Sequence, residues 1–154
     1  MTKQIPLTQD KFTVVDDDVY QWASKHKWCA HRDRGVFYAI RKERGNIVRL
    51  HREIMKASDG VHVDHISGDG LDNRRGNLRL CTHAENQRNR GSQSNNTSGF
   101  KGVSWNKSSG KWMAKIKVDG KAVHLGYFAS KEDAARAYDT AATKYHGEFA
   151  KTNF

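Results

Sequence analysis

A run of ten residues near the middle of the chain, at positions 90–99, contains no apolar side chain. It reads RGSQSNNTSG, a composition typical of flexible linkers. A hydrophobic core cannot extend across such a run, so the 154 residues should form two small units rather than one. We expect a first unit at 1–90, a linker at 91–98 and a second unit at 99–154.

The chain carries a large excess of positive charge. It has 27 Lys and Arg residues against 17 Asp and Glu residues, which gives a formal net charge of +10. A polyanion is therefore the expected partner. Only 36% of the residues are hydrophobic, so each unit should have a small core, and a large enzyme core is excluded.

The cysteines and the apolar residues indicate the environment of the protein. Cys29 and Cys81 lie far apart and form no CxxC pair, which argues against a zinc ribbon and against a disulfide framework. The sequence shows no apolar leader and no run of 18 apolar residues. We expect an intracellular, cytoplasmic protein that makes no contact with a membrane.

Short strands separated by turns dominate the first unit. The expected strands are at 5–7, 12–15, 28–31, 36–40, 47–50, 62–66 and 78–81. The acidic residues 16–18 favour the start of a short helix through Trp22, and a helical turn is expected at 51–55. Thr82 and Glu85 fit the S/T-x-x-E capping box, which predicts a helix from Thr82.

The second unit has clearer periodicity. From 111 to 118, lysines alternate with apolar residues, which predicts a half-buried strand with a basic outer face. The dipeptide at 119–120, Asp-Gly, is typical of a two-residue hairpin turn into a partner strand at 121–128. We place Val123, Leu125 and Tyr127 on one face of that strand, and expect a third strand at 101–105.

A helix is predicted at 130–146, with Ser130 as its N-cap and Gly147 as its end. Its expected buried stripe, which is rich in alanine and so permits close approach to the sheet, consists of Ala134, Ala137, Tyr138, Ala141 and Tyr145.

The segment VDHISGDGLDN, residues 63–73, places an acid beside a histidine ahead of a glycine-rich turn. By itself this pair is also typical of a strand that enters a loop. A strand, a turn, a second strand and a helix would bring Asn86 back over the strand that carries Asp64 and His65. Asn73 and Asn77 lie between them, where they also fit ordinary turn residues.

The run from 64 to 86 resembles the HNH endonuclease motif, in the Asp-His…Asn…Asn variant of phage and intron homing endonucleases. Four residues carry the match: Asp64, His65, Asn77 and Asn86. The resemblance implies that Asp64 and Asn86 bind one divalent metal ion, that His65 is the general base and that Asn77 is structural support. It also implies a phage-encoded homing enzyme that works on DNA in the infected bacterial host cell.

These residue types suit the hydrolysis of a phosphodiester. A histidine with an unperturbed pKa of about 6.5 activates water near pH 7 without extreme tuning. Oxygen ligands suit a hard cation, so we expect Mg²⁺, with Mn²⁺ as an alternative. His51 and His62 are expected to be structural or to contact phosphate. The arginines in and after the turn should hold the DNA backbone, although they also fit a solvated face: Arg74, Arg75, Arg79 and Arg88.

The motifs GFKGVSWNKSSGKW, AKIKVDGK, HLGYF, EDAARAYDTAA and AKTNF in 99–154 resemble the ethylene-response-factor, or apetala-type, DNA-binding domain. In that family a three-stranded sheet, packed on one helix, enters the major groove. Ser104 and Ala122 stand where the family usually carries arginine. Because lysine lacks the bidentate fork that reads guanine, we expect more phosphate binding and looser sequence selection. The expected DNA contacts are Lys101, Lys111, Lys115, Lys117 and His124.

Residues 1–61 resemble, more weakly, the strand-rich segment that precedes the motif in phage HNH proteins. They should pack on the motif at 62–90, because a hairpin alone is too small to bury a core. The predicted fold class is therefore α+β. It combines a strand-rich N-terminal part and a ββα-metal (HNH) hairpin with a three-stranded antiparallel sheet packed on one helix.

We expect a monomeric, metal-dependent endonuclease that nicks or cuts double-stranded DNA, with the second unit helping to select the site. The alternative is a DNA-binding regulatory or architectural protein in which the HNH fold is inactive. The sequence indicates no protein partner.

Overall fold

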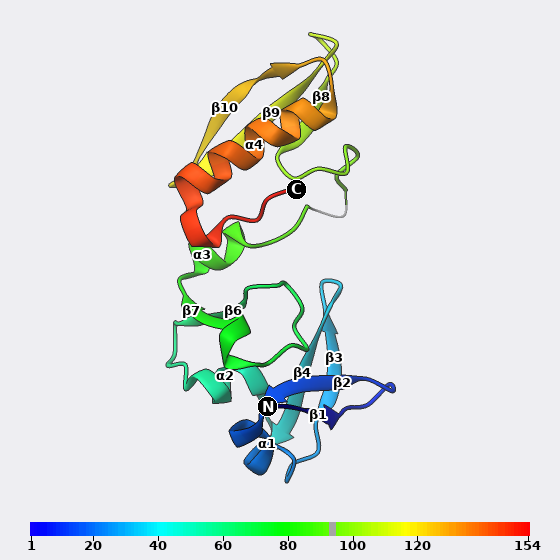
Figure 1. The fold of residues 1–154 in the computed structure, drawn as a ribbon, viewed down its shortest axis with the longest axis vertical. Helices are drawn as coiled ribbons and strands as arrows, with labels where there is room; N and C mark the ends of the chain where they lie inside the picture. The colour runs from blue at the N-terminus through cyan, green and yellow to red at the C-terminus, as the bar shows by residue number, and fades with distance from the viewer. Residues whose placement is uncertain (93–94) are drawn as a thin grey trace. The chain divides into compact units, whose positions relative to one another are not determined.

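The structure, a computed structural model, describes residues 1–92 and 95–154. Contacts between Cα atoms divide the chain into two compact units, Met1–Asn86 and Gln87–Phe154. The described residues form a mixed α/β structure with several small antiparallel sheets and four α-helices (Figure 1). Part of the predicted linker, residues 93 and 94, lies outside the described residues, and the domain boundaries given above stay predictions.

The first unit begins with short strands, as its sequence predicts. Each expected strand is present within about three residues of its predicted position. The first short helix begins within the acidic run, and the second follows the fifth strand. The elements are β1 (Thr2–Pro6), β2 (Phe12–Asp16), α1 (Asp17–Ala23), β3 (Cys29–Asp33), β4 (Val36–Glu43), β5 (Asn46–Arg49), α2 (Leu50–Met55), β6 (His62–His65), β7 (Leu78–Cys81) and α3 (His83–Arg88), whose last two residues belong to the second unit.

These strands pair with their neighbours in the chain. β1 pairs with β2, β3 with β4, β4 with β5, and β6 with β7, all antiparallel. The turns around β4 are tight because Arg34-Gly35 and Arg44-Gly45 adopt positive φ, at 48° and 91° and at 48° and 83°. A turn of 3-10 helix at Arg75–Asn77 leads into β7.

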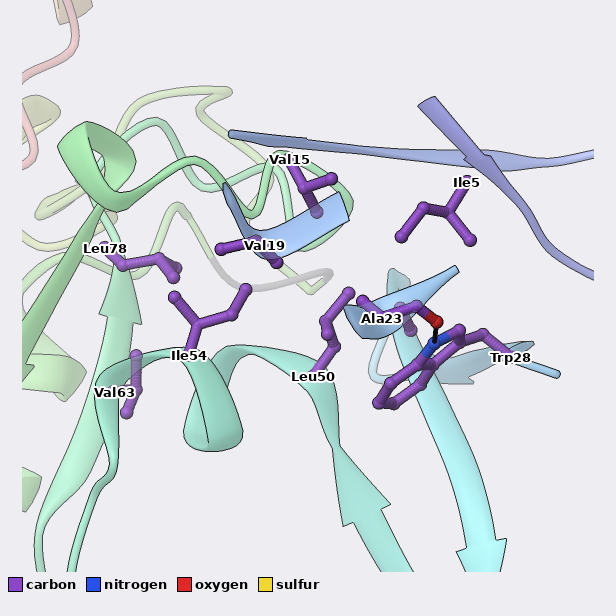
Figure 2. Close-up of a cluster of buried hydrophobic side chains, with 10 residues drawn as sticks. Ile5, Val15, Val19, Ala23, Trp28, Leu50, Ile54, Val63 and Leu78 are labelled. Atoms are coloured by element: carbon purple, nitrogen blue, oxygen red, sulfur yellow. Dashed lines mark hydrogen bonds between the residues drawn. The ribbon is translucent and has the colours of Figure 1, made fainter. Parts of the chain in front are cut away.

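One hydrophobic core joins the N-terminal strands to the hairpin of β6 and β7 (Figure 2). Only Val63 and Leu78 of this core come from the hairpin. The indole Nε1 of Trp28, on the opposite side of the cluster, donates to the carbonyl of Ala23 at 2.9 Å. The prediction that residues 1–61 pack on the hairpin is therefore confirmed. The other buried members are Ile5, Val15, Val19, Ala39, Leu50 and Ile54.

The second unit consists of β8 (Val103–Asn106), β9 (Lys111–Val118), β10 (Lys121–Phe128) and α4 (Lys131–His146), followed by a 3-10 turn at Gly147–Phe149. The strands form an antiparallel sheet in the order β10-β9-β8, and α4 lies across one face of it (Figure 1). The Oγ of Ser130 accepts from the backbone N–H of Asp133 at 3.0 Å, and α4 ends at Gly147. The predicted cap, end and Asp119-Gly120 turn are all confirmed.

Two side chains of this unit do not lie where the sequence predicts. A bulge between His124 and Gly126 shifts the register of β10, so Tyr127 faces outward opposite Met113 instead of sharing a face with Val123. Tyr145 is 43% exposed, whereas its neighbour His146 faces the sheet, with Nε2 2.9 Å from the carbonyl oxygen of Lys117 on β9.

The helix and the sheet approach closely at Gly102, which has a φ of 75°. A Cβ at this position would lie 2.1 Å from Cδ2 of Tyr138, so only glycine fits. The small side chains of α4 that make this approach possible are Ala134, Ala135, Ala141 and Ala142.

Candidate functional site

The hairpin of β6 and β7 carries the acid and the histidine of the motif on opposite faces. Asp64 pairs with Arg79 across the hairpin and His65 with Leu78. Side chains alternate along a strand, so Asp64 shares a face with His62, and His65 points the other way. The site must therefore be described from both sides of β6.

The helix α3 covers the face that carries Asp64. Its start is fixed by the predicted capping box, in which Glu85 Oε2 accepts from the Thr82 backbone at 2.8 Å and Glu85 N donates to Thr82 Oγ1 at 3.3 Å. The rings of His62 and His83 lie 5.1 Å apart, which places α3 beside β6. Because Asn86 lies three residues after His83, it shares that side of the helix.

Asp64 is buried, and a neighbouring arginine neutralises it. Its Oδ2 accepts from Nε of Arg79 at 2.9 Å and lies 2.8 Å from Nη2 of the same side chain. Their side chains are only 6% and 12% exposed. Arg79 is thus engaged with Asp64, rather than lying on a solvated face that phosphates contact.

His65 is held from its other side by a buried amide. Its Nε2 lies 3.1 Å from Oδ1 of Asn73, which has no exposed surface. Nδ2 of Asn73 donates to Oγ1 of Thr13 at 2.8 Å, and Thr13 donates to the carbonyl of Leu71 at 2.7 Å. Thr13 belongs to β2, so a strand far from the motif in sequence supports its histidine.

Two aromatic rings pack against His65. The ring of His51, on α2, lies 5.1 Å away edge-on, and that of Tyr38, on β4, lies 5.8 Å away. Burial lowers the pKa of His65, while the hydrogen bond with Asn73 and the charge of Asp64 act in the opposite direction. Burial, with the nearby charges of His65 and two arginines, lowers the pKa of His51 to about 3. Both rings are therefore neutral at pH 7.

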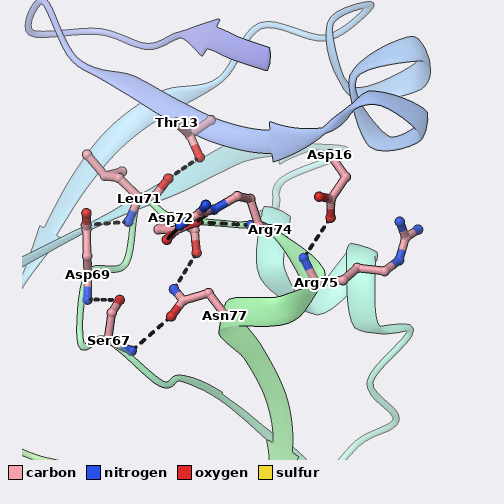
Figure 3. Close-up of polar contacts among 9 residues, drawn as sticks. All are labelled: Thr13, Asp16, Ser67, Asp69, Leu71, Asp72, Arg74, Arg75 and Asn77. Atoms are coloured by element: carbon pink, nitrogen blue, oxygen red, sulfur yellow. Dashed lines mark hydrogen bonds and ion pairs between the residues drawn. The ribbon is translucent and has the colours of Figure 1, made fainter. Parts of the chain in front are cut away.

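Asn77 closes the loop that follows His65 (Figure 3). Its Oδ1 accepts from the backbone N–H of Ser67 at 2.9 Å, and its Nδ2 donates to the carbonyl of Asp72 at 2.8 Å. Its own carbonyl accepts from the N–H of Ile66 at 2.9 Å. These bonds fit the structural role that the sequence predicts for this residue.

The two arginines of the loop form ion pairs at the surface. Arg74 makes two contacts with Asp72, Nε to Oδ1 at 2.7 Å and Nη2 to Oδ2 at 2.5 Å. The Nη1 of Arg75 lies 2.6 Å from Oδ2 of Asp18. Figure 3 shows the second contact of Arg75, in which its backbone N–H donates to Asp16 at 2.8 Å. Both guanidinium groups are about half exposed, but each already has a carboxylate partner.

The second unit places most of its predicted DNA contacts on the outer face of the sheet. Lys111, Lys115, Lys117 and His124 are exposed on the face opposite α4. The ring of Tyr127, which the bulge turns outward, lies 4.6 Å from that of His124. This face combines three positive charges with two aromatic rings.

Two other predicted contacts do not belong to that face. Lys101 precedes β8, and its Nζ donates to the backbone carbonyl of Arg88. Burial, with the nearby charge of Lys151, lowers the pKa of Lys101 to about 8. Arg88 is half-buried and lies 3.4 Å from Asp119. Both side chains stabilise the unit itself.

Sequence reasoning missed the residues that surround His65. Thr13 and Tyr38 sit in strands with no distinguishing motif, and no local pattern reveals their contacts. The sequence predicts that His51 is structural or contacts phosphate, and Asn73 also fits an ordinary turn residue, so neither is predicted to support His65. The contact between buried Asn73 and His65 can be recognised only in the folded structure, in which the loop packs on β2.

Neither metal clusters nor membrane helices are evident in the part of the chain that the structure describes. No group of three or more His, Cys, Asp and Glu side chains is arranged there to hold a metal ion. The predicted ligand pair contains one carboxylate and one amide, so it does not depend on such a group. Within residues 1–92 and 95–154, every helix is too short or too polar to span a bilayer.

Known proteins are similar to both units. A family model described as HNH endonuclease matches residues 50–88. Protein 3.8 of Escherichia phage T7 is 33% identical over 108 residues, which cover 67% of this chain and 88% of that protein. An uncharacterized HNH endonuclease of Acanthamoeba polyphaga mimivirus is 30% identical over 148 residues, covering 92% of this chain and 74% of that protein. The chain belongs to the HNH endonuclease family.

This HNH family member also carries an AP2 domain, whose family model matches residues 98–148. An AP2-like ethylene-responsive transcription factor of Arabidopsis thaliana is 47% identical over 57 residues, which cover 36% of this chain and 11% of that protein. The combination of HNH and AP2 regions predicted from the sequence is confirmed. A nuclease that binds DNA is the function class to which these matches point.

Proposed function

We propose that the protein is a metal-dependent DNA endonuclease of the homing type, which hydrolyses phosphodiester bonds in duplex DNA. The HNH unit performs the chemistry, and the AP2 domain helps to select the site. The membership of the HNH family, the AP2 match and the net charge of +10 support this proposal.

The observation that carries the proposal is the environment of His65. Hydrolysis needs a group that takes a proton from water near pH 7. His65 is a neutral imidazole because burial lowers its pKa, and Asn73 and two rings hold it in place. A neutral, fixed imidazole is suited to act as the general base.

We assign the metal to the two oxygen ligands predicted from the sequence. Asp64 and Asn86 would hold one divalent cation, Mg²⁺ or alternatively Mn²⁺, in a ββα-metal arrangement of β6, β7 and α3. A carboxylate and an amide oxygen fit a hard cation of this kind. When bound, the ion supplies positive charge to the phosphate oxygens. Asn77 would act as structural support through its loop contacts.

Arg79 bears directly on this assignment, because it contacts Oδ2 of Asp64, the carboxylate proposed as a metal ligand. The pair gives the buried carboxylate a hydrogen-bonded partner of opposite charge when no cation is present. Arg79 therefore stabilises Asp64 in the folded unit and would compete with a cation for Oδ2.

We assign duplex DNA as the partner of the AP2 domain. The outer face of its sheet offers Lys111, Lys115, Lys117 and His124 to phosphates. Lysine is a point charge that positions the backbone rather than reading bases. The domain should therefore bind many sequences and prefer a few. Arg74 and Arg75 would reach phosphate only by exchanging their carboxylate partners.

The proposed enzyme acts as a monomer with one site, which nicks one strand at a time, inside a cell that contains its DNA target. Mapping the cleavage ends in a genomic DNA pool would identify that target. Cuts scattered without preference would contradict the homing role.

The rival function is a DNA-binding regulator with an inactive HNH fold, which the AP2 match by itself also supports. Supercoiled plasmid incubated with the full chain and Mg²⁺ or Mn²⁺ separates the two. We expect nicking by the wild type, none with EDTA, and none with His65→Ala. His31→Ala, which changes an exposed histidine on β3, is the matched control and should nick normally. DNA binding without nicking for any metal or target would establish the rival.

A further inference from the structure

We propose that Asn73 is a positioning residue that fixes the proton of His65 on Nε2, so that Nδ1 is the atom that accepts the proton from water. This inference rests on the proposed nuclease function, and it names the reacting atom. It also makes β2 a part of the site, although the HNH family match begins at residue 50.

The direction of each hydrogen bond around Asn73 follows from its partners. The hydroxyl of Thr13 has one proton, which it donates to the carbonyl of Leu71 at 2.7 Å. Thr13 Oγ1 must therefore accept from Asn73 at 2.8 Å, which identifies the amide nitrogen. The carbonyl of Gly70, at 3.4 Å from the same atom, is a second acceptor. The oxygen of the amide thus faces His65.

The tautomer of His65 follows from this orientation. Oδ1 of Asn73 can only accept, and it lies 3.1 Å from Nε2 of His65. Nε2 must therefore carry a proton, and in the neutral imidazole that a general base requires, this is the ring's one N–H proton, so Nδ1 is the proton acceptor. The chain of bonds from Leu71 through Thr13 and Asn73 to His65 runs in a single direction.

The support for this chain of bonds is rigid. Thr13 and Asn73 have no exposed surface. The backbone N–H of Asn73 donates to the carbonyl of Val14 at 2.8 Å, and Val14 donates to Leu71 at 2.9 Å. The loop is thereby fastened along β2, so the amide cannot turn without breaking buried bonds.

A purely structural role for Asn73 is the competing explanation. Its backbone bonds and its amide nitrogen would by themselves anchor the loop, and the contact of Oδ1 with His65 would be incidental. The two explanations differ in what happens to the proton of His65 when the amide loses its orientation.

Nuclear magnetic resonance of the metal-free full chain, labelled with ¹⁵N-histidine, decides between them. Long-range proton–nitrogen correlations show which ring nitrogen carries the proton, and His65→Gln identifies the signals. We expect an Nε2–H form in the wild type. Asn73→Leu removes the acceptor, and Thr13→Val removes the group that orients the amide, so both should give a mixture of tautomers. Thr13→Ser keeps the hydroxyl and should restore the wild-type form.

Cleavage supplies the second readout. The single-turnover nicking rate should fall by about 10²- to 10⁴-fold in Asn73→Leu, the range that a positioned base contributes, and less in Thr13→Val. DNA affinity should not change in either variant. If Asn73→Leu does not fold, the Thr13→Val and Thr13→Ser pair decides alone.

Two results would overturn the inference: a proton on Nδ1 of His65 in the wild type, or an unchanged tautomer in every folded variant of Thr13 and Asn73. Failure of the proposed function looks different. A wild type that nicks no DNA would refute the nuclease, while the resonance data would still report the tautomer.

Discussion

Replacing His51 with phenylalanine should weaken the dependence of the first unit's stability on acid. His51 is buried on α2, in ring contact with Tyr38 and His65, and burial lowers its pKa to about 3. A histidine in the unfolded chain has a pKa of about 6.5, so the unfolded state takes up a proton first as the pH falls. The stabilisation by neutral His51 is complete above this value and is lost progressively towards pH 3.

The size of the effect follows from this difference in pKa. Between pH 6.5 and pH 5 protonation stabilises the unfolded state by about 1.4 kcal/mol for each pH unit. The free energy of unfolding of the first unit should therefore fall by about 2 kcal/mol at pH 5. That is a large part of the roughly 5–15 kcal/mol that stabilises a typical domain. Burial also lowers the pKa of His65, so this residue contributes a further loss of stability as the pH falls. That contribution remains in His51→Phe.

Urea denaturation at pH 7 and pH 5 measures this effect. The indole N–H signal of Trp28 reports on the first unit alone, whereas total fluorescence would include Trp105 and Trp112 of the second. Phenylalanine at 51 keeps a ring against Tyr38, so the core should hold. His31→Gln, in which an exposed histidine is lost, is the matched control. An acid dependence in His51→Phe as steep as in the wild type would refute the reasoning.

Three further changes test other contacts. Arg79→Ala removes the ion-pair partner of buried Asp64 and should destabilise the first unit by about 3–5 kcal/mol in urea denaturation; a loss below about 1 kcal/mol would contradict the pairing. Gly102→Ala would drive a Cβ into Tyr138 at positive φ, so the second unit should melt at a clearly lower temperature, and an unchanged melting temperature would count against this packing. Removal of residues 91–154 should weaken DNA binding and scatter cutting while leaving metal-dependent nicking, and unchanged site preference would refute the division of labour.

The parts of the fold that the sequence predicts well depend on chemistry between near neighbours. Ser130 caps α4, Glu85 reaches back to Thr82, and the Asp119-Gly120 turn supplies the positive φ that a tight hairpin requires. Each signal acts over four residues or fewer. Sequence patterns therefore locate such elements to within a few positions.

The incorrect predictions come from features that strand periodicity does not reveal. The bulge before Gly126 adds one residue to β10, and one residue reverses the faces of every side chain after it. Tyr127 consequently lies on the outer face of the sheet, not on the inner face that the alternation predicts. Gly70 likewise depends on a contact far away in the sequence, because a Cβ there would lie 2.4 Å from the carbonyl oxygen of Phe37. Its absence of a side chain permits packing against β4, which a turn pattern does not reveal.

The candidate site divides in the same way. The motif predicts Asp64, His65 and Asn77 because their spacing is local to one hairpin. The support of the histidine is not local: Thr13 acts on it through Asn73 across about 60 positions of the chain. Contacts at that separation depend on how β2 packs on the loop, so they appear only in the folded unit.

Ion pairs with nearby carboxylates determine which basic side chains are available to bind DNA. The three arginines of the hairpin region each contact a carboxylate, Arg74 with Asp72, Arg75 with Asp18 and Arg79 with Asp64. A phosphate that displaces such a partner exchanges one anion for another, so the gain in binding is small. The lysines of the AP2 sheet face have no such partner among the ion pairs of the described residues. The affinity of the full chain for DNA should thus come mainly from the AP2 domain. The salt dependence of DNA binding by the full chain should therefore resemble that of the AP2 domain rather than that of the HNH unit.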